Sequence, residues 1–158
     1  MKRLVIDVLI LQDFREQPGS IFMPLTTVKE KVIAKIKRSS TSVFLRNEFD
    51  RLGNYRQVSR AISEVVASGM LVRVGFGLYA KARPSTINGQ PVPTETLLKI
   101  GLEVMKKIGV SADVGNDAMD LREGRSTQVP MLPIIHVGKS RVSRKITIGK
   151  RQVVYEKS

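Results

Sequence analysis

Residues 55–68 bring together side chains that can read the edges of nucleic-acid bases. Arg56, Gln57 and Arg60 lie close together in this segment, and no carboxylate interrupts them before Glu64. An arginine can donate two hydrogen bonds to guanine and a glutamine can pair with adenine, each good pair giving ~1–3 kcal/mol of discrimination. A solvated helix face would carry the same charges. Whether these side chains recognise bases or only keep the protein soluble therefore has to be judged from the elements around them.

The apolar residues of this segment predict an amphipathic helix. They recur at three- and four-residue steps and form one stripe that must be buried. Asn54 and Gln57 can form a capping box at the start, and Gly69 suits a left-handed C-terminal cap. The stripe consists of Val58, Ala61, Ile62, Val65 and Val66, and the opposite face carries Arg56, Gln57, Ser59, Arg60 and Ser63.

The elements around this helix are predicted to follow the order of a winged helix-turn-helix. Thr27 and Glu30 form a capping box for a first helix that ends at Ser39 and Ser40. Residues 42–44 can be extended, and residues 45–52 form a second short helix. After the third helix, residues 71–74 and 78–80 flank Gly75-Phe76-Gly77 as a β-hairpin. In such a module the third helix enters the major groove and the hairpin contacts the neighbouring backbone or minor groove.

Further basic residues complete the predicted DNA-binding set. Arg73 lies near the hairpin tip, and Tyr55 opens the third helix. Phosphate contacts supply affinity without specificity, and those expected here come from Arg46, Arg51, Lys81 and Arg83. For Arg46 and Arg51, a role in solubility alone is an equal alternative.

Composition supports a polyanionic partner. The 158 residues carry a formal net charge of +13 with a pI near 10.4, and the charges of residues 1–22 balance, so the excess lies in residues 23–158. Such a balance favours nucleic acid, with an anionic membrane surface a distant second. The absence of cysteine excludes disulfides and thiolate sites. The apolar run in residues 1–12 contains Asp7 and is too short for a membrane span, so we expect a cytoplasmic protein.

The predicted fold class is α+β, in four parts. Residues 1–22 form an N-terminal extension, 23–83 the winged helix-turn-helix, 84–92 a linker and 93–158 a small α+β C-terminal domain. The linker is indicated by two prolines and an Asn-Gly pair. A helix is expected from Pro93, and strand-like runs at 145–148 and 152–155 are joined by a turn at 149–151.

Catalysis is not expected, and neither is a cofactor or metal. Asp113, Asp117, Asp120 and Glu123 would share a face on a helix, as a metal-dependent nuclease requires, but a solvated acidic face is the preferred interpretation. His136 lies between Ile135 and Val137 and is predicted to be a core or strand residue. The basic segment, residues 139–151, has no acidic residue and suits either phosphate contact or the charged protection of a sheet edge.

Three segments resemble the AbiEi-type antitoxin family of type IV, abortive-infection toxin–antitoxin systems. They are Arg-Val-Gly-Phe-Gly-Leu-Tyr (73–79), Ser-Thr-Gln-Val-Pro (126–130) and Lys-Ile-Thr-Ile-Gly-Lys-Arg (145–151). The resemblance implies a winged-helix domain that binds operator DNA and represses its own operon, and a C-terminal domain needed for antitoxin activity. It also implies a nucleotidyltransferase-like toxin as functional partner, without a stable direct complex. By position, the implied DNA-facing residues are Arg56, Gln57, Ser59, Arg60, Arg73, Gly75 and Phe76.

Two functional alternatives follow from the residues themselves. The same basic surface could serve an RNA-binding module, although such modules usually carry more stacking aromatics than the 5% found here. The metal-dependent nuclease is the less favoured alternative. A homodimer is plausible because one small winged domain offers few contacts for tight specific binding.

Overall fold

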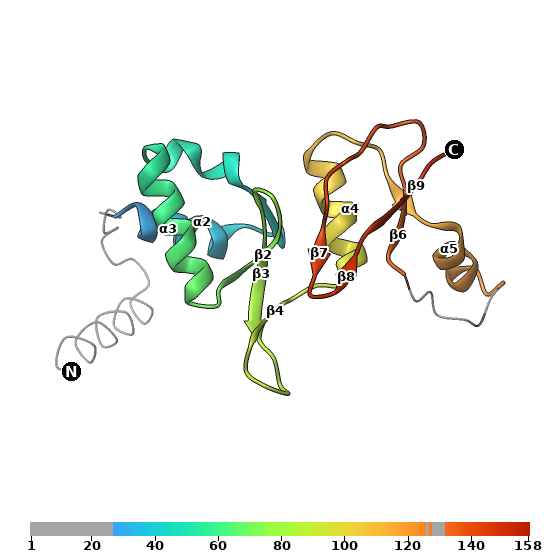
Figure 1. Cartoon of the computed structure of the whole chain (residues 1–158), viewed down its shortest axis with the longest axis horizontal. Coiled ribbons are helices and arrows are strands. Elements are labelled where there is room, and N and C mark those ends of the chain that lie inside the picture. Colours follow the sequence, from blue (N-terminus) through green and yellow to red (C-terminus); the bar gives the residue numbers. More distant parts are fainter. Residues whose placement is uncertain (1–26, 126, 128–131) are drawn as a thin grey trace, which may run out of the picture.

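The computed structural model describes residues 27–125, 127 and 132–158 (Figure 1). It contains helices and mostly antiparallel strands, which confirms the predicted α+β class. The predicted N-terminal extension and most of the 126–130 segment lie outside the described residues. The elements are α2 (Val28–Arg38), β1 (Val43–Leu45), the 3-10 helix η1 (Arg46–Leu52), α3 (Tyr55–Ala67), β2 (Leu71–Gly75), β3 (Leu78–Pro84), β4 (Pro91–Pro93), α4 (Leu97–Lys107), β5 (Asp113–Val114), α5 (Asn116–Arg122), β6 (Ile134–His136), β7 (Thr147–Ile148), β8 (Arg151–Gln152) and β9 (Val154–Glu156).

The helix ends predicted in the first half are confirmed. Asn54 Oδ1 accepts a hydrogen bond from Gln57 N at 2.9 Å, and Gln57 Oε1 accepts one from Asn54 N at 3.2 Å. Thr27 and Glu30 form the corresponding capping box of α2. Gly69 has a φ of +82°, the left-handed conformation expected after α3. Local chemistry therefore sets where these helices begin and end.

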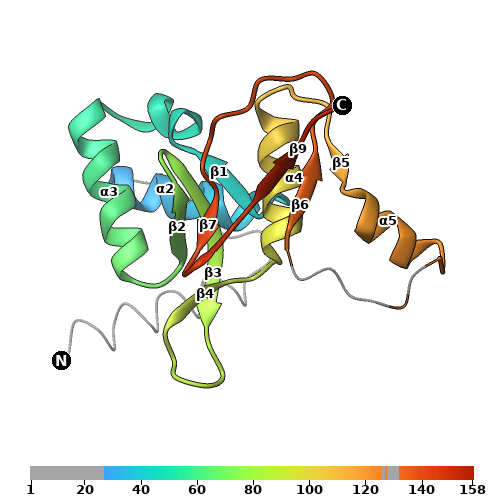
Figure 2. The same ribbon diagram turned by 45° about the vertical axis from the view of Figure 1, so that its right-hand side comes forward.

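The sheet of β1, β3 and β2, in that order, is covered on both faces. On one face, Phe44 and Leu71 pack with the buried stripe of α3 and with α2. On the other face, Val74 and Leu78 share a core with α4 and Ile146. The sheet consequently lies between the two helical layers, as Figure 2 shows. Each half of the chain buries one face of the same sheet.

The second half builds a small sheet of its own against α4. β6 pairs antiparallel with β5 and parallel with β9, and β7 and β8 form a separate hairpin. α4 approaches this sheet closely at Gly101, where an added Cβ would lie 2.3 Å from Ile135 Cδ1. The predicted run 152–155 is divided, because β8 pairs with β7 whereas β9 leaves to pair with β6.

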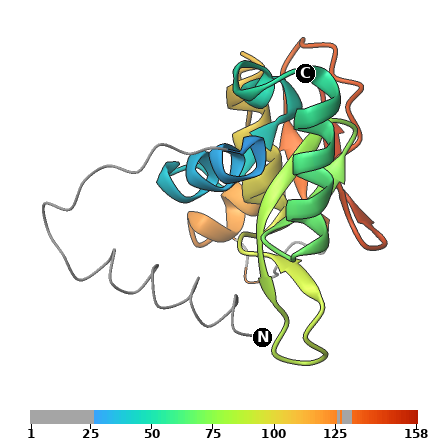
Figure 3. The same ribbon diagram turned by 90° about the vertical axis from the view of Figure 1, so that its left-hand side faces the viewer.

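The predicted linker, residues 84–92, is largely the turn of a β-hairpin. β4 pairs with the end of β3, with Arg83 opposite Val92 and Ala82 opposite Pro93. This hairpin projects from the body at the bottom of Figure 3. The expected helix start at Pro93 is wrong, because Pro93 is held in the strand pairing; α4 begins at Leu97, after the N-cap Thr96. The division into domains stays a prediction, and the core joins residues on both sides of it.

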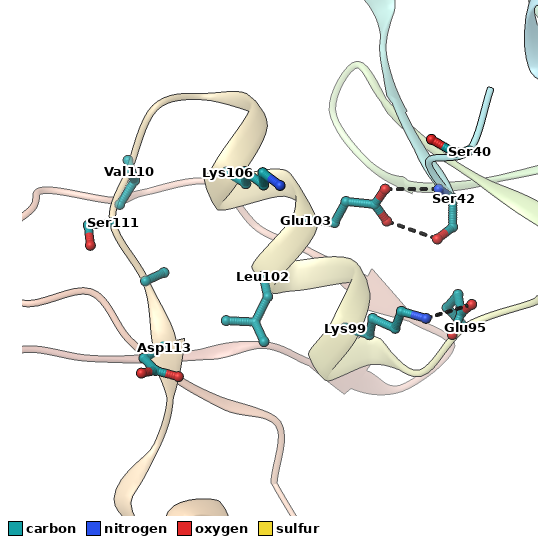
Figure 4. Close-up of a pocket in the computed structure, with 11 residues that line it drawn as sticks. Ser40, Ser42, Glu95, Lys99, Leu102, Glu103, Lys106, Val110, Ser111 and Asp113 are labelled. Atoms are coloured by element: carbon teal, nitrogen blue, oxygen red, sulfur yellow. Dashed lines mark hydrogen bonds and ion pairs between the residues drawn. The ribbon is translucent and has the colours of Figure 1, made fainter.

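Polar contacts also join α4 to the first half. Glu103 accepts hydrogen bonds from the backbone N–H and the hydroxyl of Ser42, both at 2.9 Å (Figure 4). One turn along α4, Lys107 Nζ lies 2.7 Å from Glu48 Oε1, and both side chains are largely buried. Within the described ranges, no helix has the length and apolar content needed to cross a membrane.

Truncation of Ile146 tests the shared core. Ile146 is 0% exposed and belongs to the second half, yet it packs in the cluster that covers the sheet of the first half. Ile146→Ala should lower the free energy of unfolding by ~2–5 kcal/mol, and urea unfolding should remain a single transition for both halves. Ile87→Ala is the matched control, because Ile87 is 93% exposed. Two separate transitions in the wild type would show that the halves fold independently.

The Glu103 contact gives a second stability prediction. Glu103→Ala leaves the part-buried Ser42 N–H without its acceptor, so the free energy of unfolding should fall by ~1–3 kcal/mol. Glu95→Ala is the control, since Glu95 only forms a surface ion pair with Lys99 at 2.9 Å, worth ~0.5 kcal/mol. Denaturant titration measures both variants. Equal effects would mean that the Ser42 contact contributes nothing specific.

Candidate nucleic-acid interface

α3 turns its predicted recognition residues to solvent. Tyr55 is 77% exposed, the Arg60 side chain is 85% exposed, and Arg56 and Gln57 are also exposed. Ser59 is half-buried. Glu64, which ends the uninterrupted polar face, pairs with Arg60 and Lys29, each at 3.3 Å. We call Tyr55, Arg56, Gln57, Ser59 and Arg60 the outward face of α3.

The tip of the β2–β3 hairpin lies beside the beginning of α3. The tip comprises Gly75, Phe76 and Gly77, and Phe76 is 88% exposed. Arg46 N donates a hydrogen bond to Gly77 O at 2.8 Å, which holds the tip against η1. Tyr55 and Phe76 line the same surface hollow of about 260 Å³. The sequence-predicted helix face and hairpin tip are therefore brought together.

Arg73 also belongs to this surface. Its side chain is exposed, and Nε donates to the carbonyl oxygen of Gly75 at 3.2 Å. This bond holds the guanidinium along the hairpin, close to the tip. Its terminal nitrogens retain donors for a further partner.

Arg46, predicted as a phosphate contact, has several partners within the fold. Its guanidinium forms an ion pair with Asp50, donates to Tyr55 O and Ser59 Oγ at 3.3 Å each, and lies 4.8 Å from the centre of the Tyr55 ring. Only 19% of its side chain is exposed. These contacts join η1 to the first turn of α3. Arg46 therefore positions the outward face, and its phosphate contact stays a prediction.

Gln57 is placed on the outward face but is already engaged. Its amide oxygen accepts from Asn54 N in the capping box. A bidentate contact with adenine uses both the oxygen and the nitrogen of the amide. Gln57 can therefore donate to a base from its nitrogen, and its oxygen keeps one lone pair for a base while the other accepts from the cap.

Lys81 and Arg83, two further predicted phosphate contacts, lie apart from this cluster. Lys81 Nζ donates to Ser39 O at 2.6 Å and lies 6.0 Å from the Phe44 ring centre. The side chain therefore contacts the C-terminal end of α2. Arg83 is exposed near the opposite end of β3, roughly 20 Å along the strand from the tip at ~3.3 Å per residue. Arg51 is exposed at the end of η1.

The structure places residues of the basic segment beside the hairpin tip, which the sequence did not predict. Part of the basic segment passes the hairpin tip, and a Cβ added at Gly75 would lie 2.4 Å from Lys145 O. Gly75 was predicted as a DNA contact, and its position shows a further reason for glycine there, which is the close approach of this backbone. Arg144 lines the hollow that contains Tyr55 and Phe76. The positive charge of the basic segment could be read from the sequence, but no local sequence pattern predicted that it would lie beside the hairpin tip.

Tyr155 holds the basic segment in this position. Its hydroxyl donates to Arg144 O at 2.7 Å. Burial raises the pKa of the Tyr155 phenol above its usual value, and the Arg144 charge acts in the opposite direction. The phenol therefore keeps the proton that it donates to Arg144 O throughout the neutral range.

The nuclease alternative required Asp113, Asp117, Asp120 and Glu123 to share one face of a helix, and the structure does not place all four on one helix. Asp113 lies in β5, and α5 starts only at Asn116, so Asp113 is outside that helix. Among the described residues, no three His, Asp or Glu side chains gather as a metal site would need. His136 lies in β6 as predicted, with Nε2 3.1 Å from Ser158 Oγ. In the polar hollow of Figure 4, Glu103 and Glu95 are already paired with Ser42 and Lys99.

Comparison with known proteins identifies a family but no activity. No curated protein matches the chain. A family model described as "Family of unknown function (DUF6088)" matches residues 28–158. The resemblance to AbiEi-type antitoxins stays a prediction, because the matching family carries no assigned function. The match covers every helix and strand given above, so the chain belongs to the DUF6088 family.

Proposed function

We propose that this protein is a regulator that binds duplex DNA through a winged helix-turn-helix. In this proposal α3 enters the major groove and the β2–β3 tip, as the wing, follows the adjacent backbone. The observation that carries the proposal is the exposure of the outward face of α3 next to the exposed hairpin tip, with Tyr55 and Phe76 lining one hollow and arginines on both elements.

The order of elements supports this assignment. A helix, a short strand, a short helix, a second long helix and a hairpin follow one another from Val28 to Pro84. The buried stripe of α3 packs on α2 and the sheet, which leaves its polar side free to dock. Such a helix offers its first turns to base edges in helix-turn-helix proteins. Arg56 and Arg60 are the side chains best placed for guanine.

Charge supports the same partner. The net charge of +13 favours association with a polyanion through release of condensed counterions. Helix α3 has no acidic residue in its first turn, so the positive end of the helix dipole is not offset there. The cytoplasmic location predicted from the sequence is part of this proposal.

Single-stranded RNA is the second candidate ligand. Tyr55 and Phe76 are two highly exposed aromatic rings at one hollow, and exposed aromatics are the usual platforms for unstacked bases. Duplex DNA is preferred because the arginines lie along a helix that is free to enter a groove.

The resemblance to AbiEi-type antitoxins extends the proposal. It adds repression of the protein's own operon, antitoxin activity in the C-terminal half and a nucleotidyltransferase-like toxin as functional partner. A homodimer on a two-fold symmetric operator would double the contacts of one module. The contacts of α3 and the hairpin tip support the DNA-binding part of this proposal, whereas the antitoxin part rests on the resemblance.

A competition assay separates the two ligands. Labelled duplex selected from a random-sequence pool should be displaced by unlabelled selected duplex at far lower concentration than by single-stranded RNA of equal length, because the duplex offers a groove that fits α3. The assay is run at fixed salt, since both ligands respond to ionic strength. Preferential displacement by the RNA would assign the surface to RNA binding.

Substitution of Arg60 tests base recognition. Arg60→Ala should weaken binding to the selected duplex by about 5- to 150-fold, the loss of ~1–3 kcal/mol, and should change binding to random duplex much less. Arg122→Ala is the control, because Arg122 is an exposed arginine in α5 and lies away from α3 (Figure 1). Equal loss on selected and random duplex would restrict Arg60 to the phosphate backbone.

A further inference from the structure

We propose that the C-terminal half supplies part of the same DNA-binding surface, with Arg144 and Lys145 contacting backbone phosphates beside the β2–β3 tip. This inference rests on the proposed function. It assigns to residues of the basic segment a role that the division into a DNA-binding half and an antitoxin half would not give them.

The first support is the close approach of Lys145 to the tip. The backbone oxygen of Lys145 lies where a side chain at residue 75 would begin, 2.4 Å from an added Cβ. Lys145 O is a backbone atom and cannot rotate away as a side chain would, so the contact favours glycine at residue 75. β7 follows directly and lies beside β2 (Figure 2). The basic segment is thus packed on the hairpin that forms the tip.

The second support is the anchoring of this segment on its other sides. Ile146, next to Lys145, is fully buried in the shared core, and its carbonyl accepts from Val153 N at 2.9 Å. Tyr155 donates its hydroxyl to Arg144 O at 2.7 Å. The backbone of residues 144–146 is therefore fixed, while the side chains of Arg144 and Lys145 remain exposed. A cation held this way loses little backbone freedom on binding a phosphate.

The third support is the electrostatics of the hollow. Arg46 and Asp50 line the hollow and form an ion pair with each other, and Arg144 also lines it. A second hollow beside the tip is lined by Phe76, Leu78, Ser143, Arg144 and Lys145. Arg144 lines both hollows, so it lies at the junction of the tip, α3 and the basic segment. A DNA backbone that follows the tip would pass these two cations.

Phosphate contacts have a measurable signature that base contacts lack. Each one adds about 0.9 to the slope of log affinity against log salt concentration on B-DNA, and its loss weakens all sequences equally. The slope therefore distinguishes a direct phosphate contact from a general change in folding.

The experiment uses the full chain with Arg144→Gln and Lys145→Gln combined. The double variant should lose affinity equally on selected and random duplex, and the salt slope should fall by roughly 2, one unit for each contact. The combination Lys106→Gln with Arg122→Gln removes the same charge from exposed positions on α4 and α5, and its slope should match the wild type. A slope equal to that of this control would overturn the inference.

Tyr155→Phe tests the positioning. This variant removes the hydroxyl that holds Arg144 O and leaves every charge in place. It should lower DNA affinity in the wild-type background and have no further effect when Arg144 and Lys145 are already glutamine. An equal loss in both backgrounds would show that Tyr155 acts through general stability, which would contradict the positioning role.

The outcomes separate this inference from the proposed function. If Arg60→Ala reduces selected-duplex binding while the Arg144 and Lys145 variant behaves as the control, only the inference fails. If the wild-type protein binds no duplex DNA, both fail. The Arg60, Lys106, Arg122, Arg144 and Lys145 variants should unfold thermally at the wild-type midpoint, because these side chains are exposed. Tyr155→Phe also removes a hydrogen bond of a half-buried side chain, so it is judged by the comparison of the two backgrounds.

Discussion

Burial of both faces of the β1-β3-β2 sheet is the constraint on which the rest of the structure depends. Side chains alternate between the faces of a strand, so Leu71 is directed to α3 while Val74 is directed to α4 and Ile146. The helix that carries the polar outward face and the segment that carries Arg144 are therefore fixed to opposite sides of one sheet. Neither can shift without opening a core.

This constraint explains why the candidate interface draws on distant parts of the sequence. β2 ends at a tight turn, and α3 begins beside that turn because Arg46 bonds to the backbone of both Gly77 and Tyr55. After β6, the chain passes the tip at Lys145, and the approach is close enough to favour glycine at residue 75. Residues near 55, 76 and 144 thus form one surface. The polar contacts of Glu103 and Lys107 hold the two layers in register.

Features that depend on neighbouring residues could be predicted from the sequence. Asn54, Gln57 and Gly69 define the limits of α3, and the spacing of its apolar residues identifies the face that turns outward. Features that depend on distant contacts could not. Arg46 and Lys81 carry charges like any surface residue, and only the fold shows that Arg46 donates to Tyr55 O and Ser59 Oγ and that Lys81 donates to Ser39 O. Pro93 resembles a helix start until its pairing with β3 is known.

Hydrogen exchange with and without selected duplex DNA tests the central claim most directly, because it reports on all three segments at once. If α3, the β2–β3 tip and the basic segment form a single docking surface, the amides of residues 55–60, 75–77 and 143–146 should all exchange more slowly in the complex. Protection confined to the β3–β4 hairpin or α5, with these three segments unchanged, would contradict the account.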